Sequence, residues 1–139
     1  MITLSLRFLL QVLALLGHNG CGKSSTLSVL TGLYTASGGV VEVAGHDVTV
    51  DVAAVQRNVG VCPQHDILWP QLTAHETLLL FAVVKGIVAS ARADEVARVL
   101  RAVRLTSVAH RPVGTMSGGM KRRVSVAIAA LGAPPVICE

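Results

Sequence analysis

Aromatic and charged residues are scarce in this chain of 139 residues, at 3% and 14%, whereas 52% of the residues are hydrophobic. So apolar a composition excludes a disordered chain. No run reaches the ~18 uninterrupted apolar residues of a membrane-spanning helix, and no internal repeat indicates a solenoid. The length is sufficient for one domain with a buried core.

Cysteine is also rare, and Cys21, Cys62 and Cys138 lack metal-ligand spacing. An odd number of cysteines without such spacing predicts free thiols in a reducing compartment, not a disulfide framework. The five histidines are scattered along the chain, which predicts ordinary polar side chains and no metal site.

The positive charge is concentrated in one half of the chain. The net charge is +4, and eight of the twelve Lys and Arg residues follow Ala91. Such clustering is typical either of a nucleic-acid surface or of solvated helix faces. Because no aromatic side chains for base stacking lie among these charges, we favour solvated helix faces and expect no nucleic-acid partner.

The segment Gly17–Ser24 has the form G-x-x-x-x-G-K-[ST] of a phosphate-binding P-loop. Its glycines let the backbone turn its N–H groups towards a phosphate, Lys23 reaches the β- and γ-phosphates, and the Ser24 hydroxyl binds Mg²⁺. The apolar run Val12–Leu16 predicts a buried strand before the loop, and Ser25–Thr31 predicts a helix after it. This order favours the P-loop over a chance glycine-rich turn.

The rest of the chain alternates short apolar runs with helical patterns. Strands are predicted at Val40–Val43, Val59–Cys62 and from Val136 onward. A capping box at Thr73 and Glu76 predicts a helix that ends near Gly86. A short helix is predicted over 52–57. Two further helices are predicted from about Ser90 and after Gly119, each with an apolar face at i, i+3, i+4, i+7. Gln64 follows the second of these strands, at the edge where open α/β sheets bind ligands.

Two further stretches carry a family resemblance. Met116–Arg123 (MSGGMKRR) resembles the signature motif of ABC ATPases, and Cys62–Asp66 (CPQHD) resembles their Q-loop. The three motifs also follow one another in the family's order. The amino-acid sequences around them are most similar to subfamily A, whose members are large membrane transporters that often carry lipids.

The resemblance implies an α/β fold, namely a P-loop NTPase with a mainly parallel sheet plus an α-helical signature subdomain. It also implies that this fold is incomplete here. Residues 1–139 would form one partial ABC-type ATP-binding domain. Its core would lie at about 1–70 and 124–139, and its helical subdomain at about 71–123.

The resemblance also assigns roles, with ATP and Mg²⁺ as cofactors. Lys23 and Gln64 would be catalytic, and Ser24 and Gln64 would bind the metal. An ordinary turn residue at Gln64 and a plain glycine-rich N-cap at Ser117 are the alternatives. The residues expected to bind the nucleotide are Gly17, His18, Asn19, Gly20, Cys21, Gly22, Lys23, Ser24, Ser25, Gln64, Ser117, Gly118 and Gly119.

Several family features are not found. The Walker B motif has four apolar residues, then Asp and Glu, whereas Val136–Cys138 is followed by Glu139. By spacing, Glu139 holds the last apolar position; with residues deleted it would be the catalytic Glu. No switch histidine or adenine-stacking aromatic is evident, and Phe8 lies too close to the loop for that role. We therefore expect a fragment that binds nucleotide without turnover.

The chain is expected to be the ATP-binding domain of an ABC transporter. That domain would couple ATP binding and hydrolysis to the transmembrane transport of lipid. Its expected partners are a second ABC ATPase domain in a head-to-tail sandwich and the transmembrane domains of the parent, so it would lie at the cytoplasmic face of a membrane. The alternatives are a truncated nucleotide-binding fragment and a soluble ABC ATPase of translation or DNA repair. The subfamily A wording and the lack of a long coiled-coil insertion are evidence against the last.

Overall fold

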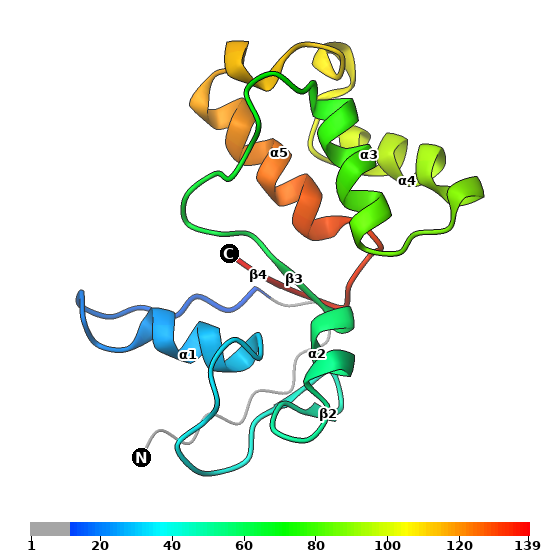
Figure 1. Ribbon diagram of the computed structural model, residues 1–139. Helices are drawn as coiled ribbons and strands as arrows, with labels where there is room; N and C mark the ends of the chain where they lie inside the picture. Colours follow the sequence, from blue (N-terminus) through cyan, green and yellow to red (C-terminus); the bar gives the residue numbers. More distant parts are fainter. Residues whose placement is uncertain (1–11) are drawn as a thin grey trace.

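The structure, a computed structural model, describes residues 12–139, so Phe8 lies outside the described residues. Figure 1 shows two parts: α1, α2 and the β1–β2 hairpin form one, and α3, α4 and α5 form the other, with β3 and β4 between them. In chain order the helices and strands are α1 (Lys23–Leu30), β1 (Glu42–Val43), β2 (His46–Asp47), α2 (Val52–Asn58), β3 (Val59–Val61), α3 (Ala74–Val84), α4 (Ala89–Ala102), the 3-10 turns η1 (Thr106–Val108) and η2 (Val113–Thr115), α5 (Gly118–Ala130) and β4 (Val136–Cys138).

The two parts meet at a parallel strand pair. Gly60 of β3 lies opposite Ile137 of β4, and the pairing extends one residue past the end of β3, where the Cys62 N–H donates to the Cys138 carbonyl at 2.8 Å. Close packing accompanies this pairing, because a Cβ atom at Gly60 would overlap the Ala129 carbonyl oxygen at the end of α5. The α/β fold with a helical subdomain is confirmed, and the two strands join its parts.

The segment before the P-loop departs from the prediction. Residues 12–18 have no regular secondary structure, and the side chains of Val12 and Leu16 are 100% and 88% exposed. The predicted strand at Val12–Leu16 is therefore wrong for this structure. A strand needs a neighbour for its backbone hydrogen bonds, and β3 pairs with β4 alone among the described residues. The run's apolar character indicates a preference for burial, not a pairing partner.

The helical part follows the sequence prediction closely. Thr73 caps α3: its Oγ1 accepts from the Glu76 N–H at 3.1 Å, and Glu76 accepts from the Thr73 N–H at 2.9 Å. The helix ends before Gly86, whose φ of 73° is a left-handed conformation that glycine adopts without strain. The predicted apolar faces of α4 and α5 meet α3 in one buried cluster, which includes Leu78, Val96, Val99, Leu100, Val124, Ala127 and Leu131.

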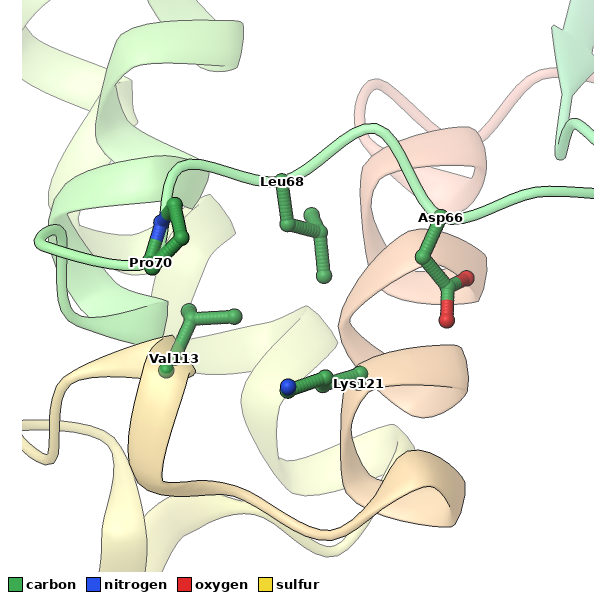
Figure 2. Close-up of a pocket in the computed structure, with 6 residues that line it drawn as sticks. Asp66, Leu68, Pro70, Val113 and Lys121 are labelled. Atoms are coloured by element: carbon green, nitrogen blue, oxygen red, sulfur yellow. The ribbon is translucent and has the colours of Figure 1, made fainter.

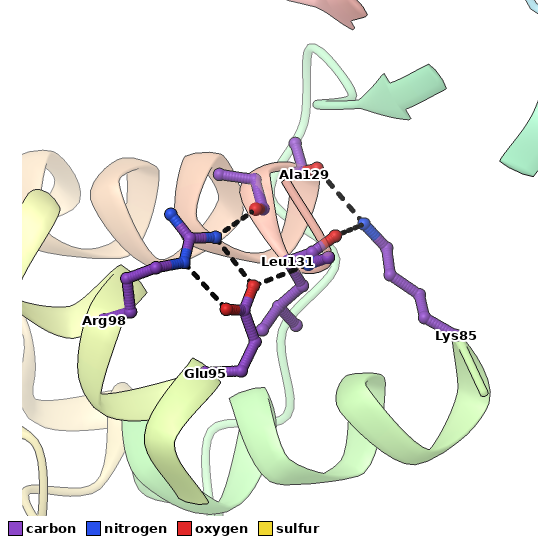
Figure 3. A network of polar contacts seen from close by, with 7 residues as sticks. Lys85, Glu95, Arg98, Ala129 and Leu131 are labelled. Carbon is purple, nitrogen blue, oxygen red and sulfur yellow. Dashed lines mark hydrogen bonds and ion pairs between the residues drawn. The ribbon is translucent and has the colours of Figure 1, made fainter. Parts of the chain in front are cut away.

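Charged side chains form hydrogen bonds with the backbone at the carboxyl end of α5 (Figure 3). Lys85 Nζ donates to the carbonyls of Ala129 and Leu131 at 3.1 and 3.0 Å. From α4, Arg98 donates to the Ala130 carbonyl at 2.9 Å, and Glu95 accepts from the Gly132 N–H at 2.6 Å. The Lys85 and Arg98 contacts satisfy carbonyls that a helix end leaves without partners, and the Glu95 contact satisfies an N–H of the following turn. Together they fix the turn that leads from α5 into β4.

The Glu95 carboxylate makes this end of α5 sensitive to acid. Its hydrogen bond with Arg98, assisted by the Gly132 N–H, lowers the pKa of Glu95 below the usual 4.5. Because the folded pKa lies below the unfolded one, the stabilisation is complete above about pH 4.5 and is lost as pH falls through the lowered value. We expect Glu95→Gln to lower the free energy of unfolding by about 1 kcal/mol at pH 7. In urea unfolding measured between pH 7 and 3, the stability of this variant should also fall less steeply with acid than that of the wild type. An equally steep fall of stability with acid in the wild type and the variant would contradict this.

Candidate functional site: the phosphate loop

The loop Gly17–Ser24 is built on glycine conformations. Gly20 and Gly22 have φ values of 84° and 95°, a left-handed region that residues with a Cβ atom rarely adopt. A Cβ atom at Gly17 would come within 2.5 Å of the Cys21 sulfur. The chain therefore curls tightly here, and α1 begins at once, at Lys23.

The Lys23 amine lies against its own loop. Its Nζ donates to the carbonyls of Gly17 at 2.7 Å and His18 at 2.8 Å. The first helical N–H bonded back to the loop is that of Thr26, which donates to the Gly22 carbonyl at 2.8 Å. The N–H groups of the first turn of α1 are thus available, beside a cation and two exposed hydroxyls, Ser24 and Ser25. Backbone donors and positive charge are the chemistry that an anion such as a phosphate requires.

The other two predicted motifs lie on other elements of the structure. Gln64 is exposed in the segment after β3, and Ser117–Gly119 is exposed at the start of α5. Ser117 Oγ accepts from the Met120 N–H at 3.3 Å, so it does cap the helix. No hydrogen bond or ion pair within residues 12–139 joins Gly17–Ser24 to Gln64 or to Ser117–Gly119.

Sequence reasoning missed the contacts between the Gln64 segment and α5. Ser125 Oγ donates to Asp66 Oδ1 at 2.7 Å, across 59 positions of the sequence. Arg122 Nη1 lies 3.7 Å from the same oxygen. All three residues stand in or beside the two recognised motifs, but the pairing spans so much sequence that no local pattern predicts it.

Several of the basic residues bind backbone carbonyls. Arg92 donates to the Ile87 carbonyl at 2.7 Å, and Arg123 donates to the carbonyls of Val103 and Arg104 at 3.2 and 3.3 Å. These guanidinium groups close helix ends and the turns between them. Arg92 and Arg123 therefore stabilise the turns of the helical part.

Residues 7–138 match the family described as ABC transporter. The chain belongs to the ABC transporter family. It is 50% identical over 126 residues to ABC transporter A family member 1 of Dictyostelium discoideum, covering 91% of this chain and 14% of that protein. It is 44% identical over 129 residues to the human glucosylceramide transporter ABCA12, covering 91% of this chain and 5% of that protein.

A solved structure is similar over most of the chain. The structure described as an ATP binding subunit of an ABC transporter matches with a TM-score of 0.72 and 28% identity, covering 88% of this chain and 51% of that one. The assignment to an ABC nucleotide-binding domain of the subfamily A kind is thereby confirmed. The chain spans a small part of the curated relatives named here. None of the helices between residues 12 and 139 is long and apolar enough to cross a bilayer.

The three thiols differ in their surroundings, which gives a test of the loop's exposure. Cys21 is exposed beside Lys23, whereas Cys62 is buried and Cys138 is partly buried. Burial raises the pKa of both Cys62 and Cys138, which slows their reaction because the thiolate is the nucleophile. We expect brief N-ethylmaleimide treatment, followed by peptide mass mapping, to label Cys21 first. Labelling of Cys62 or Cys138 ahead of Cys21 would contradict an open loop.

Proposed function

We propose that this ABC domain binds Mg-ATP at Gly17–Ser25 and couples its binding and hydrolysis to transport in a larger membrane protein. The observation that carries the proposal is the Lys23 amine held over the loop at 2.7 and 2.8 Å from two of its carbonyls, at the start of α1. A phosphate chain at this point meets the amine and the helix N-terminus together.

Each proposed residue has a distinct task. Lys23 would exchange its two carbonyl contacts for the β- and γ-phosphates, and the Ser24 hydroxyl would hold Mg²⁺, which would supply neutralisation of the phosphate charge. Gln64 lies on the carboxyl side of β3, where it would contact the metal and orient the attacking water. Ser117–Gly119 faces the nucleotide of a second ABC domain in a head-to-tail pair. Gly118 and Gly119 suit this task because nothing lies within 4 Å of where their Cβ atoms would be, so another backbone can approach closely.

Lipid is the proposed class of cargo, because the subfamily A relatives include a protein named as a glucosylceramide transporter. We place the domain at the cytoplasmic face of the membrane, in contact with transmembrane domains. We also propose that the helical subdomain, predicted at about residues 71–123, extends to the end of α5, because a boundary at residue 123 falls inside that continuous helix. A soluble ABC ATPase is the less favoured alternative, because the relatives named above are subfamily A proteins.

Calorimetric titration with ATP tests the binding role. We expect the 139-residue chain to bind Mg-ATP weakly, and to bind ATP in EDTA more weakly still. Ser24→Ala should remove most of that difference, because the hydroxyl supplies a metal ligand, while Ser37→Ala, an exposed serine outside the loop, should retain it. Equal binding with and without Mg²⁺ in the wild type would contradict a metal role for Ser24.

Turnover is a separate test. The family's Walker B Asp and Glu are not recognised among these residues, so we expect phosphate release at the background rate from this polypeptide alone. A longer polypeptide that supplies both residues and the switch histidine should hydrolyse ATP. Steady hydrolysis by residues 1–139 that Lys23→Ala abolishes would contradict the expectation of binding without turnover.

A further inference from the structure

The Gln64 segment is attached to α5 on both sides of Gln64. Before it, the Pro63 carbonyl accepts a hydrogen bond from Arg122 Nη1. After it, the Asp66 carboxylate accepts from Ser125 Oγ at 2.7 Å and lies 3.7 Å from Arg122 Nη1. Figure 2 shows the Asp66 carboxylate beside the helix that carries Lys121. Only Gln64 and His65 lie between the two attachment points, and both are exposed.

Arg122 also connects the segment to the strand pair. Its Nε and Nη2 contact Glu139 Oε1 at 3.0 and 2.9 Å, directly after β4. The side chains of Arg122 and Asp66 are 31% and 26% exposed, so water screens their pairing only in part. Ser125 is 4% exposed, which makes its hydroxyl a buried donor with a specific acceptor.

The same helix carries the signature motif. Ser117 is the N-cap of α5, and Arg122 and Ser125 lie in the next two turns. A helix is stiff over this length because each turn is hydrogen-bonded to the next. A shift of the Ser117 end of α5 therefore carries the anchors of the Gln64 segment with it.

We propose that Asp66, Arg122 and Ser125 form a clasp that fixes the position of Gln64 relative to Ser117–Gly119. All three are positioning residues: they act through Gln64 and touch no nucleotide. The inference deepens the proposed function, because the value of the position rests on the role proposed for Gln64. The contact itself does not depend on that role.

Cys62 provides a direct measurement of clasp opening. It is 3% exposed and precedes Pro63, so it becomes accessible when the segment detaches. In a Cys21→Ser, Cys138→Ala background, we expect Arg122→Met to raise the rate of Cys62 alkylation about tenfold, and Ser125→Ala severalfold. Burial raises the pKa of Cys62 and the charge of Arg122 partly offsets that rise, so removing this charge by itself raises the pKa further and slows the reaction. Faster labelling in Arg122→Met therefore reports opening and not thiol ionisation.

Urea unfolding of each variant separates local opening from general destabilisation. Arg101→Met, which removes an exposed arginine of α4, is the control and should leave the rate unchanged. The clasp is overturned if the Cys62 labelling rate does not rise in either variant. It is also overturned if the rise is no larger than the increase in globally unfolded protein accounts for. Should Arg122→Met not fold, the buried hydroxyl deletion Ser125→Ala decides on the same criterion.

Mg-ATP affinity then tests whether the clasp acts through Gln64. We expect Arg122→Met to weaken Mg-ATP binding as much as Gln64→Ala does, and the double variant to be no weaker than either single one. Additive losses would overturn the positioning role. If Gln64→Ala has no effect while Cys62 labelling still rises in the clasp variants, the role proposed for Gln64 fails and the clasp stands.

Discussion

We expect Lys23→Ala to weaken Mg-ATP binding at least about a hundredfold in a calorimetric titration. Lys23 is the cation of the loop, and its Nζ already lies 2.7 Å from the Gly17 carbonyl and 2.8 Å from the His18 carbonyl, at the place where phosphate oxygens would arrive. Alanine removes both the charge and the donors. The loop glycines and the N-terminus of α1 remain, so any residual affinity measures their contribution alone.

A matched control separates this specific effect from the loss of one positive charge. Arg57→Ala removes an exposed cation from the last turn of α2, outside the loop, and should leave the affinity within about twofold because exposed charges are screened. Circular dichroism and urea unfolding of both variants check that the fold is retained. Equal Mg-ATP binding by the wild type and Lys23→Ala would reject the phosphate site at this loop.

Gly60→Ala is expected to cost about 3 kcal/mol of folding free energy, the upper part of the usual range for overpacking. The added Cβ would overlap the Ala129 carbonyl oxygen and come within 3.1 Å of Pro134 Cγ. Backbone atoms cannot rotate away as a side chain does. Relief requires β3 and the end of α5 to separate, which disturbs the Lys85 contact with the same carbonyl at 3.1 Å. Because small domains have only about 5–15 kcal/mol in total, much of the stability is lost.

Gly38→Ala is the control for this measurement. Gly38 has nothing within 4 Å of the position of a Cβ atom, and alanine there should change the urea midpoint very little. A Gly60→Ala protein as stable as Gly38→Ala would show that β3 and α5 do not pack as closely as described. Both comparisons use the same substitution, so the loss of backbone freedom in the unfolded chain is common to them.

The sequence by itself determined the elements whose causes are local. The capping box at Thr73 and Glu76 and the glycine at Gly86 bound α3 as predicted, because caps and left-handed glycines act within a few residues. The apolar spacing of Val96, Val99 and Leu100 likewise placed one face of α4 in the core. The loop Gly17–Ser24 was recognisable because its chemistry fixes glycines and one lysine at set positions.

The tertiary structure alone decided where distant segments meet. An apolar run such as Val12–Leu16 indicates burial, but a strand forms only where another strand accepts its hydrogen bonds, and here the run is exposed. Asp66 and Ser125 are 59 positions apart, and their hydrogen bond at 2.7 Å depends on how α5 lies across the segment after β3. Lys85 likewise finds its acceptors at the end of α5 only after α3 packs beside it. Such contacts arise from packing geometry, which side-chain patterns along the chain do not encode.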